Sequence, residues 1–365
     1  MSALSSALPD FPWDLLEPAK TLAASHPDGI VDLSVGTPVD PVPEVVRRAL
    51  VEASDTPGYP LTAGTPQLRA AIAGWLARAC RASGELGVLP TIGSKELVAW
   101  LPTLLGVGPG DKVVIPQVCY PTYEVGVRLA GATVIRSDSL TAVGPARVKL
   151  VWINSPSNPT GKVLPAEHLR KVVAWARERD AIVVSDECYL SLGWESEPVS
   201  VLADEVTGGD YTGVLAVHSL SKRSNLAGYR AGFVGGDPAL IGELLAVRKH
   251  AGMIPPAPVQ AAMVAALEDE THVAEQRARY AARRDTLRAA LLKAGFEISH
   301  SEAGLYLWAT RGEDCWQTVD RLAQRGILAA PGAFYGPAAA QHVRVALTAT
   351  DERVAAAADR LAEGF

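Results

Sequence analysis

Apolar and polar positions alternate in two different ways along the first two-thirds of this chain. Short apolar runs are typical of buried strands and occupy residues 112–115, 150–153, 181–184 and 214–217. Between them lie segments with apolar residues at helical spacing, such as those after Thr65-Pro66 and after Pro165. This alternation, from about residue 65 to 236, predicts an α/β fold with a mostly parallel central sheet flanked by helices.

The pattern changes in the last third of the chain. It is mainly helical from Pro238 to about residue 292, then shows short strands after Gly295 and a helix from Asp351. A chain of 365 residues also exceeds the usual size of a single core. We therefore predict a large α/β domain over 38–275, and a smaller α+β domain formed by both chain ends, 1–37 plus 276–365.

Composition narrows the class of protein. With 48% hydrophobic and 20% charged residues the sequence is typical of a globular protein, and a net charge of −6 argues against a nucleic-acid partner. No stretch reaches membrane-span length and the first 13 residues do not resemble a signal peptide, so we expect a cytoplasmic protein without a membrane partner. The four scattered cysteines indicate buried thiols, with no disulfide framework and no metal site.

The most informative stretch runs from Ser219 to Arg230, directly after the apolar run 214–217. Lys222 lies there on a short Ser-rich turn, where partial burial favours the neutral amine that attacks a carbonyl. The hydroxyls of Ser219 and Ser221 and the guanidinium of Arg230 suit a phosphate group. Together they indicate a lysine that holds pyridoxal phosphate as a Schiff base.

Two earlier strands end in polar side chains that fit the same cofactor. Asp186 follows the run 181–184 and could pair with the protonated pyridine nitrogen, which keeps the ring an electron sink. Tyr189, three residues on, could donate a hydrogen bond to the phenolate oxygen of the ring. Asn158, after the run 150–153, could bond the same oxygen. All these positions fall at carboxyl ends of strands, where α/β proteins bind ligands.

These motifs resemble those of the fold-type I, pyridoxal phosphate-dependent aminotransferases of class I and II, the aspartate aminotransferase superfamily. Asn158, Asp186, Lys222 and Arg230 follow one another at separations of 28, 36 and 8 residues, as in that family. The resemblance extends from Gly36, in Val35-Gly36-Thr37-Pro38, to Arg344 near the C-terminus.

The resemblance implies further roles for individual residues. Gly93, Ser94 and Lys95, leading into a helical segment, match a phosphate-binding helix N-terminus. Tyr120, rather than Tyr123, matches the aromatic residue that stacks on the cofactor ring. Arg344 matches the arginine that binds the substrate α-carboxylate, with the Gly36 backbone over the same group and Asn158 beside it. Tyr59 matches a tyrosine that reaches the cofactor phosphate of the neighbouring subunit, which implies a homodimer with shared active sites.

The expected activity is therefore transamination of small amino-acid and 2-oxo-acid substrates. Lys222 would hold the cofactor, be displaced by the substrate amine and then act as general acid and base, with Asp186 and Tyr189 assisting. Segments 7–14, 28–43, 58–66 and 93–96 look like those of actinobacterial succinyldiaminopimelate aminotransferases. This resemblance implies amino transfer between glutamate/2-oxoglutarate and N-succinyl-LL-2,6-diaminopimelate/N-succinyl-2-amino-6-oxopimelate, in lysine and diaminopimelate biosynthesis. Lys95 and the loop 252–256 are candidates for contacting the distal end of that substrate.

Three alternatives remain at this level. The chain could be another class I or II aminotransferase, acting on N-acetylornithine, aspartate or aromatic substrates. It could also be a pyridoxal phosphate-dependent C–S β-lyase, since the cofactor site would be the same. A regulator with an aminotransferase-like domain would need an additional basic DNA-binding domain, for which the thirty or so residues before Gly36 leave no room.

Overall fold

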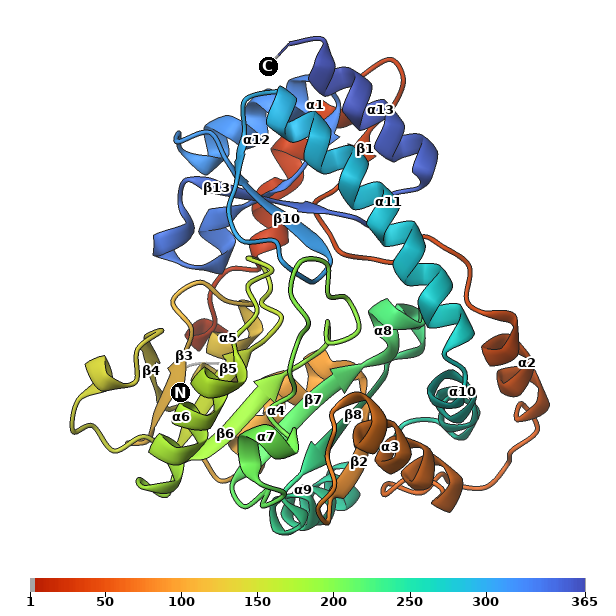
Figure 1. Ribbon diagram of the computed structural model, residues 1–365, viewed down its shortest axis with the longest axis vertical. Coiled ribbons are helices and arrows are strands. Elements are labelled where there is room, and N and C mark those ends of the chain that lie inside the picture. The colour runs from red at the N-terminus through yellow and green to blue at the C-terminus, as the bar shows by residue number, and fades with distance from the viewer. Residues whose placement is uncertain (1–3, 365) are drawn as a thin grey trace.

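A seven-stranded sheet forms the centre of the larger body of the computed structural model, which describes residues 4–364 (Figure 1). Its strand order is β2-β8-β7-β6-β5-β3-β4, and only β8 runs antiparallel to its neighbours. The strands are β2 (Gly87–Ile92), β3 (Lys112–Ile115), β4 (Thr133–Arg136), β5 (Leu150–Asn154), β6 (Ile182–Asp186), β7 (Val214–Ser219) and β8 (Ala231–Gly236). The predicted α/β class with a mostly parallel sheet is confirmed.

Helices cover both faces of this sheet because successive strand residues point to opposite sides. In β5, Val151 and Ile153 pack in one hydrophobic cluster, whereas Leu150 and Trp152 pack in another. The helices of this body are α2 (Glu44–Glu52), α3 (Pro66–Ala79), α4 (Gly93–Leu104), α5 (Thr122–Leu129), α6 (Ala166–Arg177), α7 (Asp204–Thr207), α8 (Leu220–Arg223), α9 (Pro238–Ala251) and α10 (Ala257–Glu268). The central strands β5 to β8 are almost wholly buried because helices cover both of their faces.

The ends of the chain form a second body with its own hydrophobic cluster, in the upper part of Figure 1. It contains a four-stranded antiparallel sheet in the order β12-β13-β10-β9 and a two-stranded parallel pair, β1 and β11. Its strands are β1 (Val31–Asp32), β9 (Glu297–Ile298), β10 (Tyr306–Thr310), β11 (Ile327–Leu328), β12 (Ala330–Pro331) and β13 (His342–Ala346). Its helices are α1 (Glu17–Ala24), α12 (Cys315–Gln324) and α13 (Asp351–Ala362).

The long helix α11 (Thr271–Lys293) runs between the two bodies, from α10 up to α13 (Figure 1). Short 3₁₀ turns complete the secondary structure at Leu4–Ala7, Pro12–Leu16, Thr141–Val143, Ala227–Tyr229, Gly332–Tyr335 and Pro337–Ala339. No helix among the described residues is both long and apolar enough to cross a membrane. The exact domain boundaries, at 37/38 and 275/276, stay a prediction.

Local sequence explains several of these boundaries. Thr65 caps α3 by accepting a hydrogen bond from the Leu68 N–H at 3.1 Å, with Pro66 as the first helical residue, as the sequence predicts. Pro165 is the N-cap residue of α6, one position before the first helical residue, Ala166. Three of the four cysteines are buried as expected, whereas Cys188 is only partly buried.

A charged network ties α11 to the segments around it. The buried Arg283 donates from Nη2 and Nη1 to the two carboxylate oxygens of Asp40, at 2.6 and 2.8 Å, and from Nε to Asp351 at 2.6 Å. Gln276 also donates to Asp40, at 2.7 Å. This bidentate ion pair compensates the buried charge of Arg283 and fixes the position of α11.

We expect Arg283→Met to destabilise the protein by about 2–4 kcal/mol, because Asp40 would keep only its amide partner. Urea unfolding of the holoenzyme measures this change. Arg288→Met, at an exposed position of the same helix, is the control and should change stability by less than about 0.5 kcal/mol. Equal effects of the two substitutions would contradict the expected result.

Candidate active site

Three parallel strands end side by side and bring the predicted site residues together. The register aligns Asn154 of β5 with Asp186 of β6, and Asp186 with Val217 of β7. The segments that follow these strands carry Asn158 and Lys222. Residues far apart in sequence therefore meet at one edge of the sheet, as the sequence predicts.

Asp186 is buried at the end of β6 and is held from three sides. The hydroxyl of Tyr123 donates to Oδ2 at 2.8 Å, and the Cys188 N–H donates to Oδ1 at 3.2 Å. The side-chain amide of Asn154 donates to the Asp186 backbone carbonyl at 2.9 Å. Burial raises the pKa of Asp186, and the bonds from Cys188 and Tyr123 oppose that rise. A buried acid of this kind is stabilised by a cationic partner.

Lys222 lies on the single-turn helix α8, directly after β7. The Ser219 hydroxyl caps that turn by accepting from the Ser221 N–H at 3.1 Å. The Lys222 amine donates to the backbone carbonyl of Gly36, which comes from the other end of the chain. Burial lowers the pKa of Lys222, and the charges of Arg344 and Arg230 lower it further. The neutral, nucleophilic amine is therefore more accessible than in an exposed lysine.

Arg344 is buried in the middle of β13 and faces the same site. Its guanidinium donates to the Asn158 side-chain oxygen at 2.9 Å and to the Ser34 carbonyl at 2.7 Å. It lies 3.9 Å from the ring centroid of Tyr306 and 5.0 Å from that of Tyr335. Among the described residues no carboxylate pairs with it, and its Nε has no hydrogen-bond partner. A buried cation without a counter-charge is costly, so this position suits an anionic ligand.

Tyr306 connects several parts of the site. Its hydroxyl lies 3.1 Å from that of Tyr189, which is buried. It also approaches Gly36 so closely that a Cβ there would lie 2.2 Å from the Tyr306 hydroxyl oxygen. Only glycine fits at position 36, and its backbone is thereby held beside Arg344 and Lys222.

The predicted phosphate-binding residues meet at the start of α4. This helix begins at Gly93, whose φ of +71° favours glycine, and a Cβ there would lie 2.5 Å from Nη2 of Arg230. Ser94 and Lys95 follow in the first turn, so free backbone N–H groups and the Arg230 guanidinium share one place. Arg230 is exposed, and burial together with Arg230 lowers the pKa of Lys95.

Two tyrosines near the site have different surroundings. Tyr123 is fully buried and stacks on Trp152 with ring centroids 4.9 Å apart, so it is occupied as a support for Asp186. Tyr120 is only partly buried and packs edge-on against Tyr123. Tyr59 stands outside this cluster, with its side chain fully exposed at 101%.

Sequence reasoning missed five residues that build this site: Tyr123, Asn154, Ser34, Tyr306 and Tyr335. Asn154 carried a signal, because it is the polar residue that ends a buried apolar run. Its Oδ1 accepts from the Asn158 N–H at 2.7 Å and so positions that loop. The tyrosines of the smaller body carried none, since tyrosine in a buried strand is also ordinary core packing.

Comparison with known proteins agrees with this geometry. Residues 28–361 match the family aminotransferase class I and II. A probable aminotransferase of Mycobacterium tuberculosis is 65% identical over 98% of this chain and 86% of its own length. The 4-dedimethylamino-4-oxo-anhydrotetracycline transaminase OxyQ of Streptomyces rimosus is 61% identical over 97% of this chain and 99% of its own. Among solved structures, a probable N-succinyldiaminopimelate aminotransferase of Thermus thermophilus superimposes with a TM-score of 0.88 at 29% identity, covering 97% of this chain and 100% of that one.

The chain therefore belongs to the class I and II aminotransferases, with the fold-type I architecture. It is a transaminase that depends on pyridoxal phosphate. The residues present fit this cofactor. Asp186 offers a buried carboxylate to a cationic group, Lys222 has a lowered pKa, and Gly93 at the start of α4 leaves room beside Arg230. Because Gly93 has no Cβ, Arg230 can lie against the N-terminus of α4.

We expect Tyr123→Phe to weaken cofactor binding, because Tyr123 donates to Asp186, the residue that we predict to pair with the pyridine nitrogen of the cofactor. Losing the hydrogen bond to a charged group costs about 1.5–3 kcal/mol, or roughly 10–100-fold in affinity. The substitution also raises the pKa of Asp186 further, so the loss should grow as the pH falls and more of the acid is protonated. Titration of the apoenzyme with pyridoxal phosphate at several pH values measures this.

The matched control is Tyr211→Phe, which removes a buried hydroxyl that accepts from the Gly84 N–H, away from the site. Its cofactor affinity should stay at the wild-type value at every pH. A Tyr123→Phe enzyme with unchanged affinity across the pH range would contradict the supporting role of Tyr123.

Proposed function

We propose that this transaminase moves an amino group between glutamate/2-oxoglutarate and N-succinyl-LL-2,6-diaminopimelate/N-succinyl-2-amino-6-oxopimelate. The observation that carries the proposal is the unpaired, buried charge of Arg344 close to Lys222. Each of these substrates presents an α-carboxylate next to the reacting carbon. One bidentate arginine can therefore serve both half-reactions.

Each predicted site residue has a role in this proposal. Pyridoxal phosphate supplies an electron sink for the bonds at the substrate Cα. Lys222 would hold the cofactor through Nζ and would move a proton at the substrate Cα through the same atom. Burial lowers the pKa of Lys222, which favours the neutral amine that such proton transfer requires.

The remaining residues hold the reactants in place. Asp186 would keep the pyridine nitrogen protonated, and Asn158 and Tyr189 would hold the phenolate oxygen of the ring. Tyr120 would stack on the ring. The phosphate would be held by residues from the start of α4, the end of β7, α8 and the turn before β8: Gly93, Ser94, Lys95, Ser219, Ser221 and Arg230.

The distal end of the substrate decides which transaminase this is. The succinylated compound is long and carries extra negative charge, so it needs a cationic or polar group beyond the cofactor ring. Lys95 fits this requirement, since it lies in the first turn of α4 and its amine faces the ring of Phe11 at 5.3 Å. The other candidate for contacting the distal end is the loop 252–256. Arg248 holds this loop by donating to the Met253 carbonyl at 3.2 Å, and it also donates to Glu96 of α4 at 3.0 and 3.2 Å.

A second candidate substrate is a fused-ring ketone. It is favoured by the identity to OxyQ, whose name specifies a 4-oxo-anhydrotetracycline. It is also favoured by the aromatic side chains near Lys95, where Phe11 packs on Trp13 at 5.8 Å and Trp13 on Phe334 at 5.5 Å. Apolar rings stack well on such surfaces.

Steady-state kinetics over a substrate panel separates these candidates. With glutamate as donor, we expect the succinylated oxopimelate to exceed aspartate, aromatic and N-acetylornithine-derived partners by at least about 100-fold in kcat/KM, or about 2.7 kcal/mol. Because Lys95 also belongs to the proposed phosphate site, Lys95→Met is assayed with saturating pyridoxal phosphate. It should lower kcat/KM for the succinylated substrate by a larger factor than for the small substrates. A greater kcat/KM for an anhydrotetracycline ketone would replace the succinylated substrate by the second candidate.

We also propose that the protein is a homodimer in which Tyr59 reaches the cofactor phosphate of the neighbouring subunit. The full exposure of this tyrosine in a single chain supports the idea, because an aromatic ring gains by burial at an interface. Leu61 beside it is also exposed, at 55%.

Mixing two defective variants tests the shared site. If Tyr59 crosses the interface, dimers of Tyr59→Ala with Lys222→Ala contain one complete site, so re-associated mixtures should recover up to about a quarter of wild-type activity. The control pairs Asp186→Asn with Lys222→Ala, two residues of one subunit's site, and should recover none. A mixture no more active than its control, or an active monomer, would refute the shared site.

A further inference from the structure

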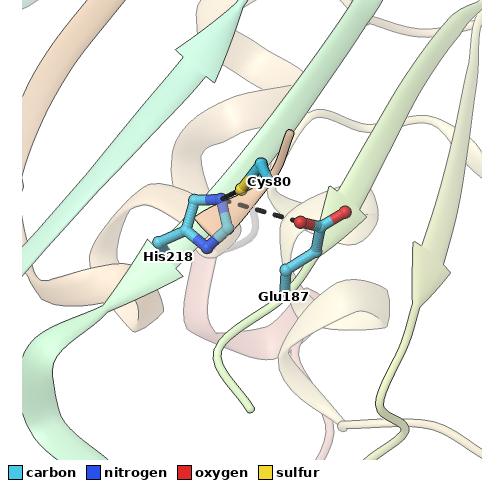
Figure 2. A group of neighbouring side chains, drawn as sticks. All are labelled: Cys80, Glu187 and His218. Atoms are coloured by element: carbon cyan, nitrogen blue, oxygen red, sulfur yellow. Dashed lines mark hydrogen bonds and ion pairs between the residues drawn. The ribbon is translucent and has the colours of Figure 1, made fainter. Parts of the chain in front are cut away.

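Three potential metal ligands meet inside the larger body, on residues that the transamination site does not use. Cys80 ends α3, Glu187 directly follows β6, and His218 lies in β7 (Figure 2). All three side chains are almost wholly buried, with at most 2% exposure. Figure 2 shows the imidazole of His218 facing both the thiol of Cys80 and the carboxylate of Glu187, with a dashed line to each.

The separations of the three ligand atoms suit one small cation. His218 Nε2 lies 3.7 Å from Glu187 Oε2 and 3.8 Å from Cys80 Sγ, and all three atoms lie within 4.8 Å of one another. Even at the widest separation, a central point lies about 2.4 Å from each atom, against zinc bond lengths of about 2.3 Å to sulfur and 2.0–2.2 Å to nitrogen and oxygen. Small side-chain adjustments would complete the coordination.

A second observation points to a ligand at the same place. Glu187 Oε2 is buried and has no hydrogen-bond partner. The carboxylate is oriented by its other oxygen, which accepts from the Val201 N–H at 2.7 Å. A cavity of about 10 Å³ adjoins Glu187 and His218, with Ser191 and Arg223 in its wall. It has room for about one water molecule, which would serve as a fourth ligand.

The charges also balance around a divalent cation. A thiolate, a carboxylate and a neutral imidazole around Zn²⁺ would give a site of zero net charge. Arg223, which lines the same cavity, is held by Glu270 through Nη2, at 3.0 Å from both carboxylate oxygens, whereas its Nε and Nη1 have no hydrogen-bond partner among the described residues.

We propose that Cys80, Glu187 and His218 form a structural zinc site. Thiolate and imidazole ligands select zinc over magnesium or calcium, which prefer oxygen. The ion would link the C-terminus of α3 to β6 and β7. Asp186 ends β6, and Lys222 lies on the turn directly after β7. It would bind as the chain folds and release protons from Cys80 and Glu187.

Metal analysis of the tag-free holoenzyme, purified from zinc-supplemented cells without chelator, tests the site. We expect about one zinc per chain by mass spectrometry, and X-ray absorption should show one sulfur among nitrogen and oxygen neighbours at about 2.0–2.3 Å. Cys80→Ala should lose the zinc. Cys315→Ala, which removes an equally buried thiol from α12, should keep it.

Glu187→Gln provides a second test, because the amide keeps the acceptor for the Val201 N–H and so spares the fold. Its zinc affinity should fall at least 100-fold, and added zinc should not raise its thermal midpoint, whereas we expect a rise for wild type stripped of zinc. Wild-type protein with well under one zinc per chain, zinc without a sulfur neighbour, or unchanged zinc in either Cys80→Ala or Glu187→Gln would overturn the proposal. The three groups would then form a neutral hydrogen-bonded cluster.

Discussion

The burial of Arg344 without a carboxylate partner among the described residues is the constraint on which the site depends. A guanidinium removed from water needs its charge and its donors compensated, and this protein supplies only part of that. Asn158 and the Ser34 carbonyl accept two hydrogen bonds, and the faces of Tyr306 and Tyr335 offer weak electrostatic attraction. The remaining compensation has to come from an anion, which makes the same residue both a cost to the folded protein and a binding site for a carboxylate.

The other charges of the site follow the same logic. Burial, together with the charges of Arg344 and Arg230, lowers the pKa of Lys222, and burial raises the pKa of Asp186. In our proposal, the anionic phosphate and the cationic ring nitrogen of the cofactor would compensate both effects.

Rigid supports on either side keep these groups in place. Tyr123 and Asn154 hold Asp186 from within the sheet, and the pair Arg248–Glu96 fixes the start of α4. On the side of β6 and β7 lined by α3, the cluster of Cys80, Glu187 and His218 reaches the same two strand ends. In our proposal, substrate specificity depends on the periphery of the site, where the aromatic ring of Phe11 meets Lys95.

The sequence by itself determined the class of fold and the centre of the site. Apolar strand runs imply a covered parallel sheet whatever the tertiary detail, and the residues that end those runs must then share one edge, which places Asn158, Asp186 and Lys222 together. Motif spacing added Arg230 and Arg344. Only the tertiary structure decided what depends on contacts between distant segments: that Tyr123 supports Asp186, that Gly36 lies under Tyr306, and that Arg344 has no counter-charge. It also decided that Cys80 lies beside His218, because nothing local to either residue records a neighbour 138 positions away. The periodicity of apolar residues predicts which face of a helix or strand a residue occupies. Which residues meet across the core depends instead on how whole helices and strands pack.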